Sequence, residues 1–454
     1  MSVKVCKFGG TSLADASQIQ RVCELVRADS DRRFVVPSAP GKRFDGDQKI
    51  TDLLYLCHEH AWQGIAFDEV FALVGERFRA ITAELGLSLD IDAHLNEVHA
   101  GIASHAQAGQ PADYAASRGE YLNGLILAHA LNYSFLDPQT AIHFDRRGRL
   151  NESKTYEAMR EALSSVEGAV VPGFYGQAHD GTVKTLSRGG SDVTGAIVAR
   201  AMHASVYENW TDVSGLLMAD PGIVDQPRII DVITYRELRE LSYMGAKVLH
   251  EEAVFPVRAA GIPLNIRNTR EPEAPGTTIV SEEDAQRFTT GSISGIAGRK
   301  DFTIIAVEKA MMNAEVGFGR RVLGALENAG VNFEHMPSGI DTLSVVVADS
   351  EVDGKLEDIV STIKSECRPD SVDVYANMAL VATVGRGMAH TPGMAARVFS
   401  ALAEQGVNIR MIDQGSSELN IIVGVEADDF DEAVRAIYSA FVDQPASAAS
   451  GSAH

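Results

Sequence analysis

The chain has 454 residues, of which 45% are hydrophobic, and its 40 basic and 62 acidic residues give a formal net charge of −22. The length predicts about two to four domains, and the negative charge argues against a general nucleic-acid or membrane-surface binder, which needs a positive field. The four cysteines fit neither a metal motif nor a disulfide framework, and no signal peptide or apolar run of membrane-spanning length is apparent. We therefore expect reduced cysteines and a cytoplasmic protein.

A short strand over residues 3–8 ends in Lys7-Phe8-Gly9-Gly10 and precedes a helical pattern over residues 14–28. The two glycines allow the backbone to approach a bulky anion without Cβ clashes. A helix that begins just after them directs unpaired N–H groups at that anion, and Lys7 adds a full positive charge. The pattern predicts a phosphate site, although a glycine turn after a strand is more often a plain chain reversal.

Strand-like runs alternate with helical patterns up to about residue 280. The strand-like runs cover residues 34–36, 169–171, 205–207 and 263–266, and the helical patterns cover residues 67–85, 114–131, 195–202 and 235–260. Strands separated by helices predict a mostly parallel sheet with helices on both faces.

A second glycine loop, with the sequence TLSRGGSD over residues 185–192, again joins a strand-like run to a helix. Arg188 has a planar guanidinium that suits a carboxylate, and Ser191 or Asp192 is placed to cap the helix. The simpler alternative is a capped helix after a glycine turn. In an open α/β sheet the carboxyl ends of the strands line one crevice, so both glycine loops are able to face one ligand.

Three further stretches carry polar groups. A buried Glu120 in the helix over 114–131 would need a cationic partner, and without other context a solvated face for Arg118 and Glu120 is the favoured interpretation. The polar stretch 209–215 suits a nucleotide base and ribose but is nonspecific. Lys247, in the helix expected over 235–260, is placed to reach phosphates.

Residues 281–292 are polar and unpatterned and indicate a linker. The sequence pattern changes after them, and an internal repeat appears. The run Gly-Val-Asn at 330–332 recurs at 406–408, and the offset of 76 residues holds at every matching pair of the repeat. A period this long indicates a duplicated domain, and each copy has the pattern of a small α+β module of ferredoxin-like topology. The tail from residue 444 is low in complexity and is expected to be disordered.

Five motifs occur in a fixed order: KFGGTS (7–12), SRGE (117–120), LSRGGSD (186–192), WTDVSG (210–215) followed by ADP (219–221), and YMGAKVLH (243–250). With the stretch PSAPGKRFDGDQKITDLL (37–54) and the duplicated unit, they resemble the aspartate kinases of the amino-acid kinase family, which carry tandem ACT domains. The match covers essentially residues 2–440.

The resemblance implies an α/β protein with a three-layer αβα kinase domain over residues 1–285. Its sheet would be mostly parallel. Two ferredoxin-like ACT domains would follow over residues 293–370 and 375–441, with the C-terminal strand available to complete the first ACT domain. Residues 442–454 would form a disordered tail.

The implied reaction transfers the γ-phosphoryl group of ATP to the β-carboxylate of L-aspartate, the entry step to lysine, threonine, methionine and diaminopimelate biosynthesis. The carboxylate is ionised at pH 7, so no general base is needed and none is evident. By resemblance, Lys7 stabilises charge on the transferring group and Asp192 orients Lys7. Arg188 would hold a substrate carboxylate and Glu120 the α-ammonium, while Thr51 and Ser191 complete the aspartate pocket.

The resemblance also implies a nucleotide site, in which Gly9 and Gly10 donate backbone N–H groups. Its residues would be Lys7, Phe8, Gly9, Gly10, Thr211, Asp212, Leu217, Lys247 and Val248. Mg²⁺ would be held mainly by the ATP phosphates, without protein metal ligands. The chain departs from the family pattern at Leu217, where an aromatic residue is frequent, and at Gly222, where arginine is frequent, and Arg228 is a candidate substitute.

The ACT modules imply feedback control by lysine, threonine or both, and a homodimer or higher homo-oligomer. The candidate effector residues are Met312, Ser338, Gly339 and Asp341, with Glu315 as a second carboxylate for a cationic effector. Solvated loop residues are the alternative. Two other functions remain open: another kinase of the same fold, or an amino-acid sensor on a catalytically silent kinase. The sensor would be expected to have lost Lys7, Arg188 or Asp192, and all three are present.

Overall fold

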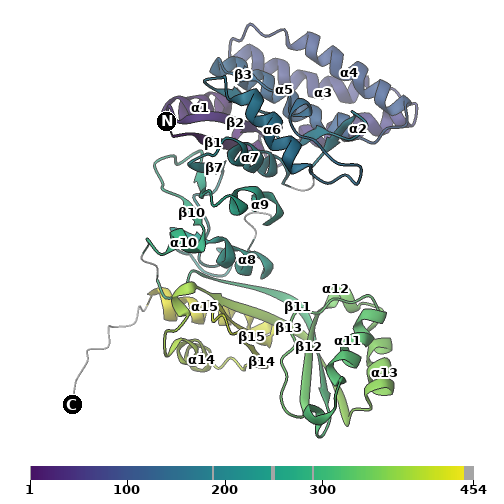
Figure 1. Cartoon of the computed structure of the whole chain (residues 1–454), viewed down its shortest axis with the longest axis vertical. Helices are drawn as coiled ribbons and strands as arrows, with labels where there is room; N and C mark the ends of the chain where they lie inside the picture. Colours follow the sequence, from purple (N-terminus) through teal and green to yellow (C-terminus); the bar gives the residue numbers. More distant parts are fainter. Residues whose placement is uncertain (1, 187–188, 247–250, 289–290, 444–454) are drawn as a thin grey trace, which may run out of the picture. The chain divides into compact units, whose positions relative to one another are not determined.

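The computed structural model describes residues 2–186, 189–246, 251–288 and 291–443 (Figure 1). The chain forms two compact units. The first comprises residues 1–216, 229–235 and 248–288, and the second comprises residues 217–228, 236–247 and 289–454. Two segments that precede residue 285 therefore group with the C-terminal part of the chain, while the domain boundary expected near that residue stays a prediction.

The first unit is built on an eight-stranded sheet with the order β3-β4-β2-β1-β7-β9-β10-β8. All neighbouring strands pair in parallel except β9 and β10, which are antiparallel, so the predicted mostly parallel sheet is confirmed. The bounds are β1 (Lys4–Phe8), β2 (Arg32–Pro37), β3 (Ser134–Phe135), β4 (Ala169–Val170), β7 (Val206–Thr211), β8 (Val232–Thr234), β9 (Leu264–Asn268) and β10 (Thr277–Val280), with a separate hairpin of β5 (Tyr175–Gln177) and β6 (Val183–Thr185).

The helices of the first unit form two groups. One group packs together and contacts β2 and β4, and it consists of α1 (Ala16–Arg27), α2 (Ile50–Trp62), α3 (Asp68–Glu84), α4 (Ile91–Gln107) and α5 (Asp113–Leu131). In the other group, α7 (Gly190–Ala201) packs on α6 (Glu152–Leu163) and α9 (Glu251–Ala259) and contacts β1, β2 and β7. Two helical layers around one sheet give the expected αβα architecture. The short helices are η1 (Gly10–Leu13), η2 (Pro138–Thr140) and α10 (Glu282–Ala285).

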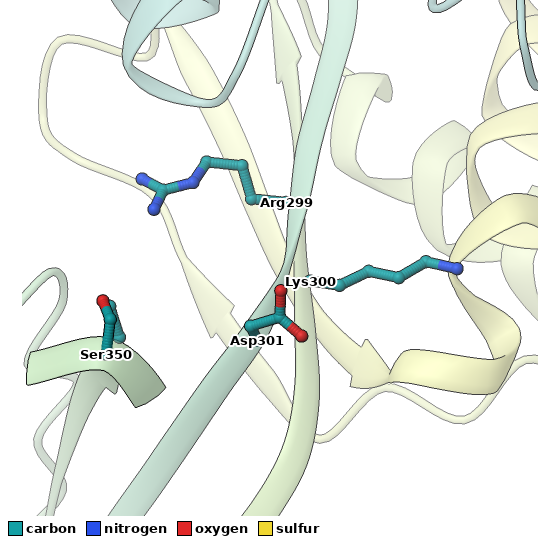
Figure 2. A pocket seen from close by; sticks show the side chains of 5 residues that line it. Arg299, Lys300, Asp301 and Ser350 are labelled. Atoms are coloured by element: carbon teal, nitrogen blue, oxygen red, sulfur yellow. The ribbon is translucent and has the colours of Figure 1, made fainter. Parts of the chain in front are cut away.

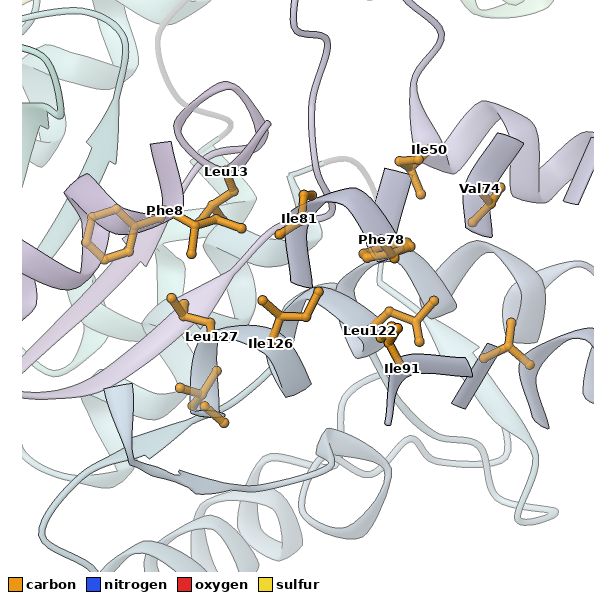
Figure 3. Packing of buried hydrophobic residues seen from close by; sticks show 14 of the residues in the cluster. Phe8, Leu13, Ile50, Val74, Phe78, Ile81, Ile91, Leu122, Ile126 and Leu127 are labelled. Atoms are coloured by element: carbon orange, nitrogen blue, oxygen red, sulfur yellow. The ribbon is translucent and has the colours of Figure 1, made fainter. Parts of the chain in front are cut away.

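The side chains of strand β1 alternate between the two faces of this sheet, because successive side chains of a strand point in opposite directions. Cys6 and Phe8 are fully buried in the core that also contains Phe78 of α3 and Ile126 of α5 (Figure 3). Lys7, between them, instead points to the face that α7 covers, where it meets a residue of that helix. The alternation explains why a charged residue stands between two core residues.

The second unit contains a five-stranded antiparallel sheet with the order β12-β11-β13-β15-β14. Its strands are β11 (Gly295–Glu308), β12 (Thr342–Ala348), β13 (Ser371–Val384), β14 (Met411–Asp413) and β15 (Asn420–Glu426). Two of these strands serve both repeats. Residues 302–308 of β11 pair with β12, whereas residues 295–299 pair with the end of β13 that also pairs with β15.

The two modules are therefore joined by β11 and β13, the two longest strands, each of which contributes residues to both modules. The expectation that the C-terminal strand completes the first ACT domain is wrong, because β15 lies between β13 and β14. A register shift in β11 between Arg299 and Ile304 redirects that strand from one module to the other.

Each module covers the sheet with a pair of helices, whereas the sequence repeat indicated one helix in each copy. α11 (Phe318–Asn328) packs against α13 (Leu356–Cys367), and α14 (Met394–Glu404) packs against α15 (Phe430–Tyr438), over two separate hydrophobic clusters. The remaining elements are α8 (Tyr235–Tyr243), η3 (Met312–Ala314), α12 (Asp349–Val352), η4 (Arg386–Met388), η5 (Ala427–Asp429) and the π-helical turn η6 (Ser439–Asp443). Across the described chain, no helix has the length and apolar character needed to cross a bilayer.

Two local predictions fail for identifiable reasons. The single helix expected over residues 235–260 is wrong because α8 ends at Tyr243 and Gly245 adopts a φ of +104°, which a continuous right-handed helix excludes. The expected linker over 281–292 begins with a helix, α10, because Ser281 accepts a hydrogen bond from the backbone N–H of Asp284 at 3.1 Å and caps it. The expected disorder of the tail from residue 444 concerns residues outside the described part.

Candidate active site

The turn after β1 presents a backbone amide at the carboxyl edge of the sheet. The N–H of Gly9 donates to the carbonyl oxygen of Trp210 at 3.0 Å, whereas the N–H of Gly10 has no partner among the described residues. A Cβ on Gly10 would lie 2.8 Å from the carbonyl oxygen of Ala39, so the close approach of the two loops requires glycine. Of the two amides expected to bind phosphate, that of Gly10 is the one available.

Lys7 and Asp192 meet on the face of the sheet that α7 covers. Lys7 Nζ lies 2.7 Å from Asp192 Oδ1, and both side chains are largely buried. Asn209 on β7 contacts both, because its Oδ1 lies 3.4 Å from Lys7 Nζ and its Nδ2 donates to Asp192 Oδ1 at 2.9 Å. An ion pair at the end of a strand, beside a free amide, is suited to binding a phosphate group.

The interpretation that Ser191 or Asp192 caps α7 is wrong. The N-cap residue is Gly189, which has a φ of +74°, and no side chain caps this helix. The left-handed conformation explains the glycine at this position. Asp192 is consequently free to pair with Lys7.

Glu120 lies on α5 with a buried carboxyl group. The residue is 6% exposed, and its Oε2 has no hydrogen-bond partner in the described chain. Burial raises the pKa of Glu120 to about 8, although a hydrogen bond from the backbone of Ala39 and the charge of Arg118 oppose the shift. A buried carboxyl group with an unpartnered oxygen is suited to a cationic ligand.

Arg118 is buried beside Glu120 on the same helix. Its guanidinium carbon lies 4.5, 4.6 and 5.0 Å from the ring centroids of Tyr114, Tyr121 and Tyr175. Three aromatic faces stabilise a cation away from water. The solvated-face interpretation is therefore wrong for both Arg118 and Glu120.

The other aspartate-site residues border the loop that follows β2. A Cβ on Gly119 would lie 2.8 Å from Ala39 Cβ and 3.3 Å from Ile50 Cγ2, so Glu120 lies beside the start of α2, where Thr51 follows Ile50. On the other side, the N–H of Gly173 donates to the carbonyl oxygen of Pro37 at 3.0 Å.

Ser191 reaches the same loop through Gly173. A Cβ on Gly173 would lie 2.5 Å from the buried Ser191 Oγ, so this contact also requires glycine. The structure thus brings the elements that carry Thr51, Glu120 and Ser191 to one loop. Arg188 lies outside the described residues, and its contact with a substrate carboxylate stays a prediction.

The structure describes only some of the residues that were expected to bind the nucleotide. Thr211 ends β7, and its Oγ1 donates to Asp212 Oδ1 at 3.2 Å. Phe8 is fully buried and stacks on Trp210, so only its backbone is available to a ligand. Leu217 is 37% exposed and belongs to the second unit, while Lys247 and Val248 lie outside the described residues.

The expected effector residues lie at one end of the first ACT module. Asp341 Oδ1 accepts a hydrogen bond from the N–H of Met311 at 2.7 Å, and Gly339 N–H donates to the carbonyl oxygen of Thr342 at 2.7 Å. Ser338 forms a β-bridge with Leu343. Met312, in η3, is buried in the core of this module.

A separate hollow of about 290 Å³ opens in the second unit at the register shift of β11 (Figure 2). It is lined by Arg299, Lys300, Asp301, Ala348 and Ser350. Lys300 already pairs with Asp431 at 3.2 Å, and none of the residues expected to bind aspartate or nucleotide lines it. It is therefore not the candidate active site.

Comparison with known proteins identifies the family. Residues 2–268 match the model of the amino acid kinase family, and residues 381–441 match an ACT domain. Aspartokinase 3 of Bacillus subtilis is 38% identical over 97% of this chain and 98% of its own length. The chain belongs to the aspartokinases of the amino acid kinase family.

Solved structures of the family agree with this assignment. The aspartate kinase of Clostridium acetobutylicum is 53% identical and superposes with a TM-score of 0.89, covering 98% of this aspartokinase-family chain and all of the other. Escherichia coli aspartokinase III, solved in complex with aspartate and ADP, is 25% identical with a TM-score of 0.70 and covers 96% and 99% of the two chains. The chain spans about half the length of bifunctional aspartokinase/homoserine dehydrogenases of plants, with 29% identity to one from Arabidopsis thaliana.

One residue of the aspartokinase site was not singled out from the sequence. Asn209 lies within the polar stretch 209–215, but neither its type nor its spacing indicates that it contacts Lys7. The pairing of β1 with β7 aligns Lys7 with Asn209, and this register follows only from the assembled sheet. The available signal is an amide directly before the Trp-Thr-Asp turn, at the position that faces a lysine across the sheet.

Proposed function

We propose that this chain transfers the γ-phosphoryl group of ATP to the β-carboxylate of L-aspartate and releases ADP and 4-phospho-L-aspartate. The observation that carries the proposal is the Lys7–Asp192 ion pair at the Gly9-Gly10 turn, together with the buried carboxyl group of Glu120. The complex of E. coli aspartokinase III with aspartate and ADP supports it by relationship.

The reaction needs positioning and charge stabilisation more than proton transfer. An oxygen of the aspartate β-carboxylate forms a bond to the γ-phosphorus, and the bond from that phosphorus to the β–γ bridging oxygen breaks. The bridging oxygen leaves as part of ADP, so no proton is taken from the nucleophile. Lys7 stabilises the negative charge of the transferring group, and the N–H of Gly10 donates a hydrogen bond to it.

Aspartate itself carries an α-ammonium and an α-carboxylate that must be recognised. Glu120 accepts the ammonium, which ionises the carboxyl group that burial keeps protonated. Arg188 holds the carboxylate in a bidentate contact, and the hydroxyl groups of Thr51 and Ser191 complete the pocket. The pocket accordingly selects a small amino acid with two acidic groups.

The nucleotide side is formed by the β1 turn and the end of β7. Among the described residues, no cluster of three or more His, Cys, Asp or Glu side chains is arranged to hold a metal ion. In this proposal Mg²⁺ is bound mainly by the ATP phosphates, whose negative charge it neutralises. Thr211, Asp212, Leu217, Lys247 and Val248 complete the nucleotide site in this proposal.

The ACT modules would make the enzyme an allosteric, feedback-regulated one. The E. coli relative is named a lysine-sensitive aspartokinase, and it was also solved with lysine and aspartate. By this relationship, lysine, alone or with threonine, binds at Met312, Ser338, Gly339 and Asp341. We also propose a homodimer or higher homo-oligomer through the ACT modules and a cytoplasmic location for this biosynthetic step.

The direct test is ATP-dependent formation of aspartyl hydroxamate from L-aspartate. Lys7→Ala should abolish turnover while the protein stays folded, since it removes the charge at the transferring group. Lys4→Ala is the matched control, because Lys4 lies on the same strand and pairs with Asp29 at 2.7 Å away from the site. Folded wild-type protein without hydroxamate formation would favour the amino-acid sensor, and activity on glutamate, acetylglutamate or UMP would favour another kinase.

A further inference from the structure

The central strands β1 and β7 pair in parallel, and three successive residue pairs across them make side-chain contacts. Cys6 lies opposite Glu208, Lys7 opposite Asn209, and Phe8 opposite Trp210. The outer two pairs are structural: Cys6 Sγ donates to Glu208 Oε2 at 3.3 Å, and the Phe8 ring stacks on Trp210 with centroids 6.0 Å apart. The middle pair, which points to the opposite face, belongs to the site.

The side chain of Asn209 joins the two charged groups of that site. Its carbonyl oxygen faces Lys7 Nζ at 3.4 Å, and its NH₂ group donates to Asp192 Oδ1 at 2.9 Å. Only this orientation of the amide satisfies both partners, since the ammonium group donates only and the carboxylate accepts only. Lys7, Asp192 and Asn209 therefore form a closed triangle of contacts.

An amide suits this place for a chemical reason. An aspartate would repel Asp192 and would have no proton to donate to it, and an aliphatic residue of the same size would contact neither charge. Asn209 is 4% exposed, so the hydrogen bonds it makes are not replaced by water when they are lost.

The strand that carries Asn209 is itself held rigidly. Arg32 Nε lies 2.8 Å from Glu208 Oε2, and Trp210 Nε1 donates to the same oxygen at 2.9 Å. These contacts fix the residues on either side of Asn209. A side chain on such a support holds its partners in one geometry, which is what a preorganised charge site requires.

We propose that Asn209 is a positioning residue that fixes the Lys7 ammonium group against Asp192 in the orientation needed for phosphoryl transfer. The proposal rests on the proposed aspartate kinase activity. Asn209 acts through Lys7 and contacts neither reacting atom in this proposal. Its loss should consequently lower kcat and leave the affinities for substrates largely unchanged.

The test compares steady-state kinetics of the full chain with those of Asn209→Leu and Asn209→Asp. Leucine keeps the size of the side chain and removes both hydrogen bonds, so kcat should fall about tenfold to a hundredfold while KM for aspartate and for ATP stays within about threefold. The aspartate variant loses the donor to Asp192 and should also lower kcat. It provides the measurement if the leucine variant fails to fold.

The matched control is Asn265→Leu on the neighbouring strand β9. Asn265 Nδ2 donates to the carbonyl oxygens of Pro275 and Thr277, so this variant loses structural hydrogen bonds without touching the site. It should lower the melting temperature and leave kcat within about threefold of wild type.

Three outcomes would overturn the positioning role: a folded Asn209 variant with wild-type kcat, a rise in KM alone, or an equal loss of kcat in Asn265→Leu. Failure of the proposed function is separate, because it would appear as wild-type protein that forms no hydroxamate.

Discussion

Arg77 Nη2 lies 2.6 Å from Asp47 Oδ2, and both residues are buried, although one is on helix α3 and the other is in the loop after β2. Arg77 Nη1 also donates to the carbonyl oxygen of Gly41 at 3.1 Å. The same loop packs on the phosphate turn, because Gly41 N–H donates to the carbonyl oxygen of Gly10 at 2.8 Å. A buried ion pair outside the site thus holds the loop against the site.

Arg77→Met should destabilise the protein by about 3 kcal/mol, because it leaves a buried carboxylate with one cationic partner fewer. Arg79→Met on the same helix is the control, since Arg79 and Asp92 form an exposed pair and should contribute less than about 1 kcal/mol. Urea unfolding at pH 7 measures both. Similar midpoints for the two variants would contradict the role given to Arg77.

The effect of Arg77→Met on the unfolding free energy should depend on pH, because Asp47 titrates. Hydrogen bonds from Arg43 hold the pKa of Asp47 well below its usual value, and the charge of Arg77 contributes to the shift. A lowered pKa stabilises the folded state above the usual carboxyl pKa, and this stabilisation is lost as the pH falls. The difference in unfolding free energy between wild type and Arg77→Met should therefore become smaller below about pH 4.

Gly41→Ala should reduce activity through the phosphate turn. The added Cβ would lie 2.6 Å from the carbonyl carbon of Gly10 and 2.8 Å from its oxygen, so the two loops must separate. We expect a loss of at least about tenfold in kcat/KM for ATP, since small displacements of positioned groups are costly in catalysis. Gly46→Ala in the same loop is the control, because its Cβ would meet only Phe44 at 3.8 Å. Equal activities of the two variants would exclude this steric coupling.

The sequence predicted the parallel sheet, the duplicated module and the two glycine loops because each depends on local pattern. It misjudged Glu120 because burial of that side chain depends on the contact of Gly119 with Ala39, which lies far away in the chain. Asn209 escaped notice for the same reason, as its role follows from the register of β1 with β7. The break at Gly245 was missed because a glycine within a helical pattern does not by itself indicate a positive φ.

Glu120→Gln should stabilise the ligand-free protein at alkaline pH. Burial raises the pKa of Glu120 to about 8, so the folded state binds its proton more tightly than the unfolded state does. The corresponding stability is fully present below the unfolded pKa of about 4.3 and is lost as the pH rises through about 8. The variant should match wild type in unfolding free energy at pH 4 and exceed it by a few kcal/mol at pH 9, at about 1.4 kcal/mol per pKa unit.

The same substitution should impair aspartate binding. Glutamine cannot ionise to pair with the α-ammonium, so KM for aspartate should rise about tenfold or more while KM for ATP stays nearly constant. The difference in unfolding free energy between wild type and variant should also shrink when saturating aspartate is added. A variant with less stability than wild type at pH 9 and an unchanged KM would contradict both parts.

Asp341 should bind a cationic effector in preference to Glu315, the other carboxylate of this loop region. Glu315 already pairs with Lys309 at 3.1 Å and with Arg321. Asp341 is exposed and receives one backbone hydrogen bond, from Met311, while the described chain provides no cation as its partner. Its charge is therefore less neutralised than that of Glu315.

Asp341→Asn should accordingly raise the lysine concentration for half-inhibition by about tenfold or more, when each variant is compared with its own uninhibited rate. Glu315→Gln should change this concentration less, because it alters a carboxylate whose charge two cations already balance. The measurement is a lysine titration of hydroxamate formation, repeated with threonine and with both amino acids. If Glu315→Gln relieved inhibition and Asp341→Asn did not, the effector would bind Glu315 instead of Asp341. Full activity of the wild type at millimolar lysine and threonine would show that neither residue takes part in regulation by these amino acids.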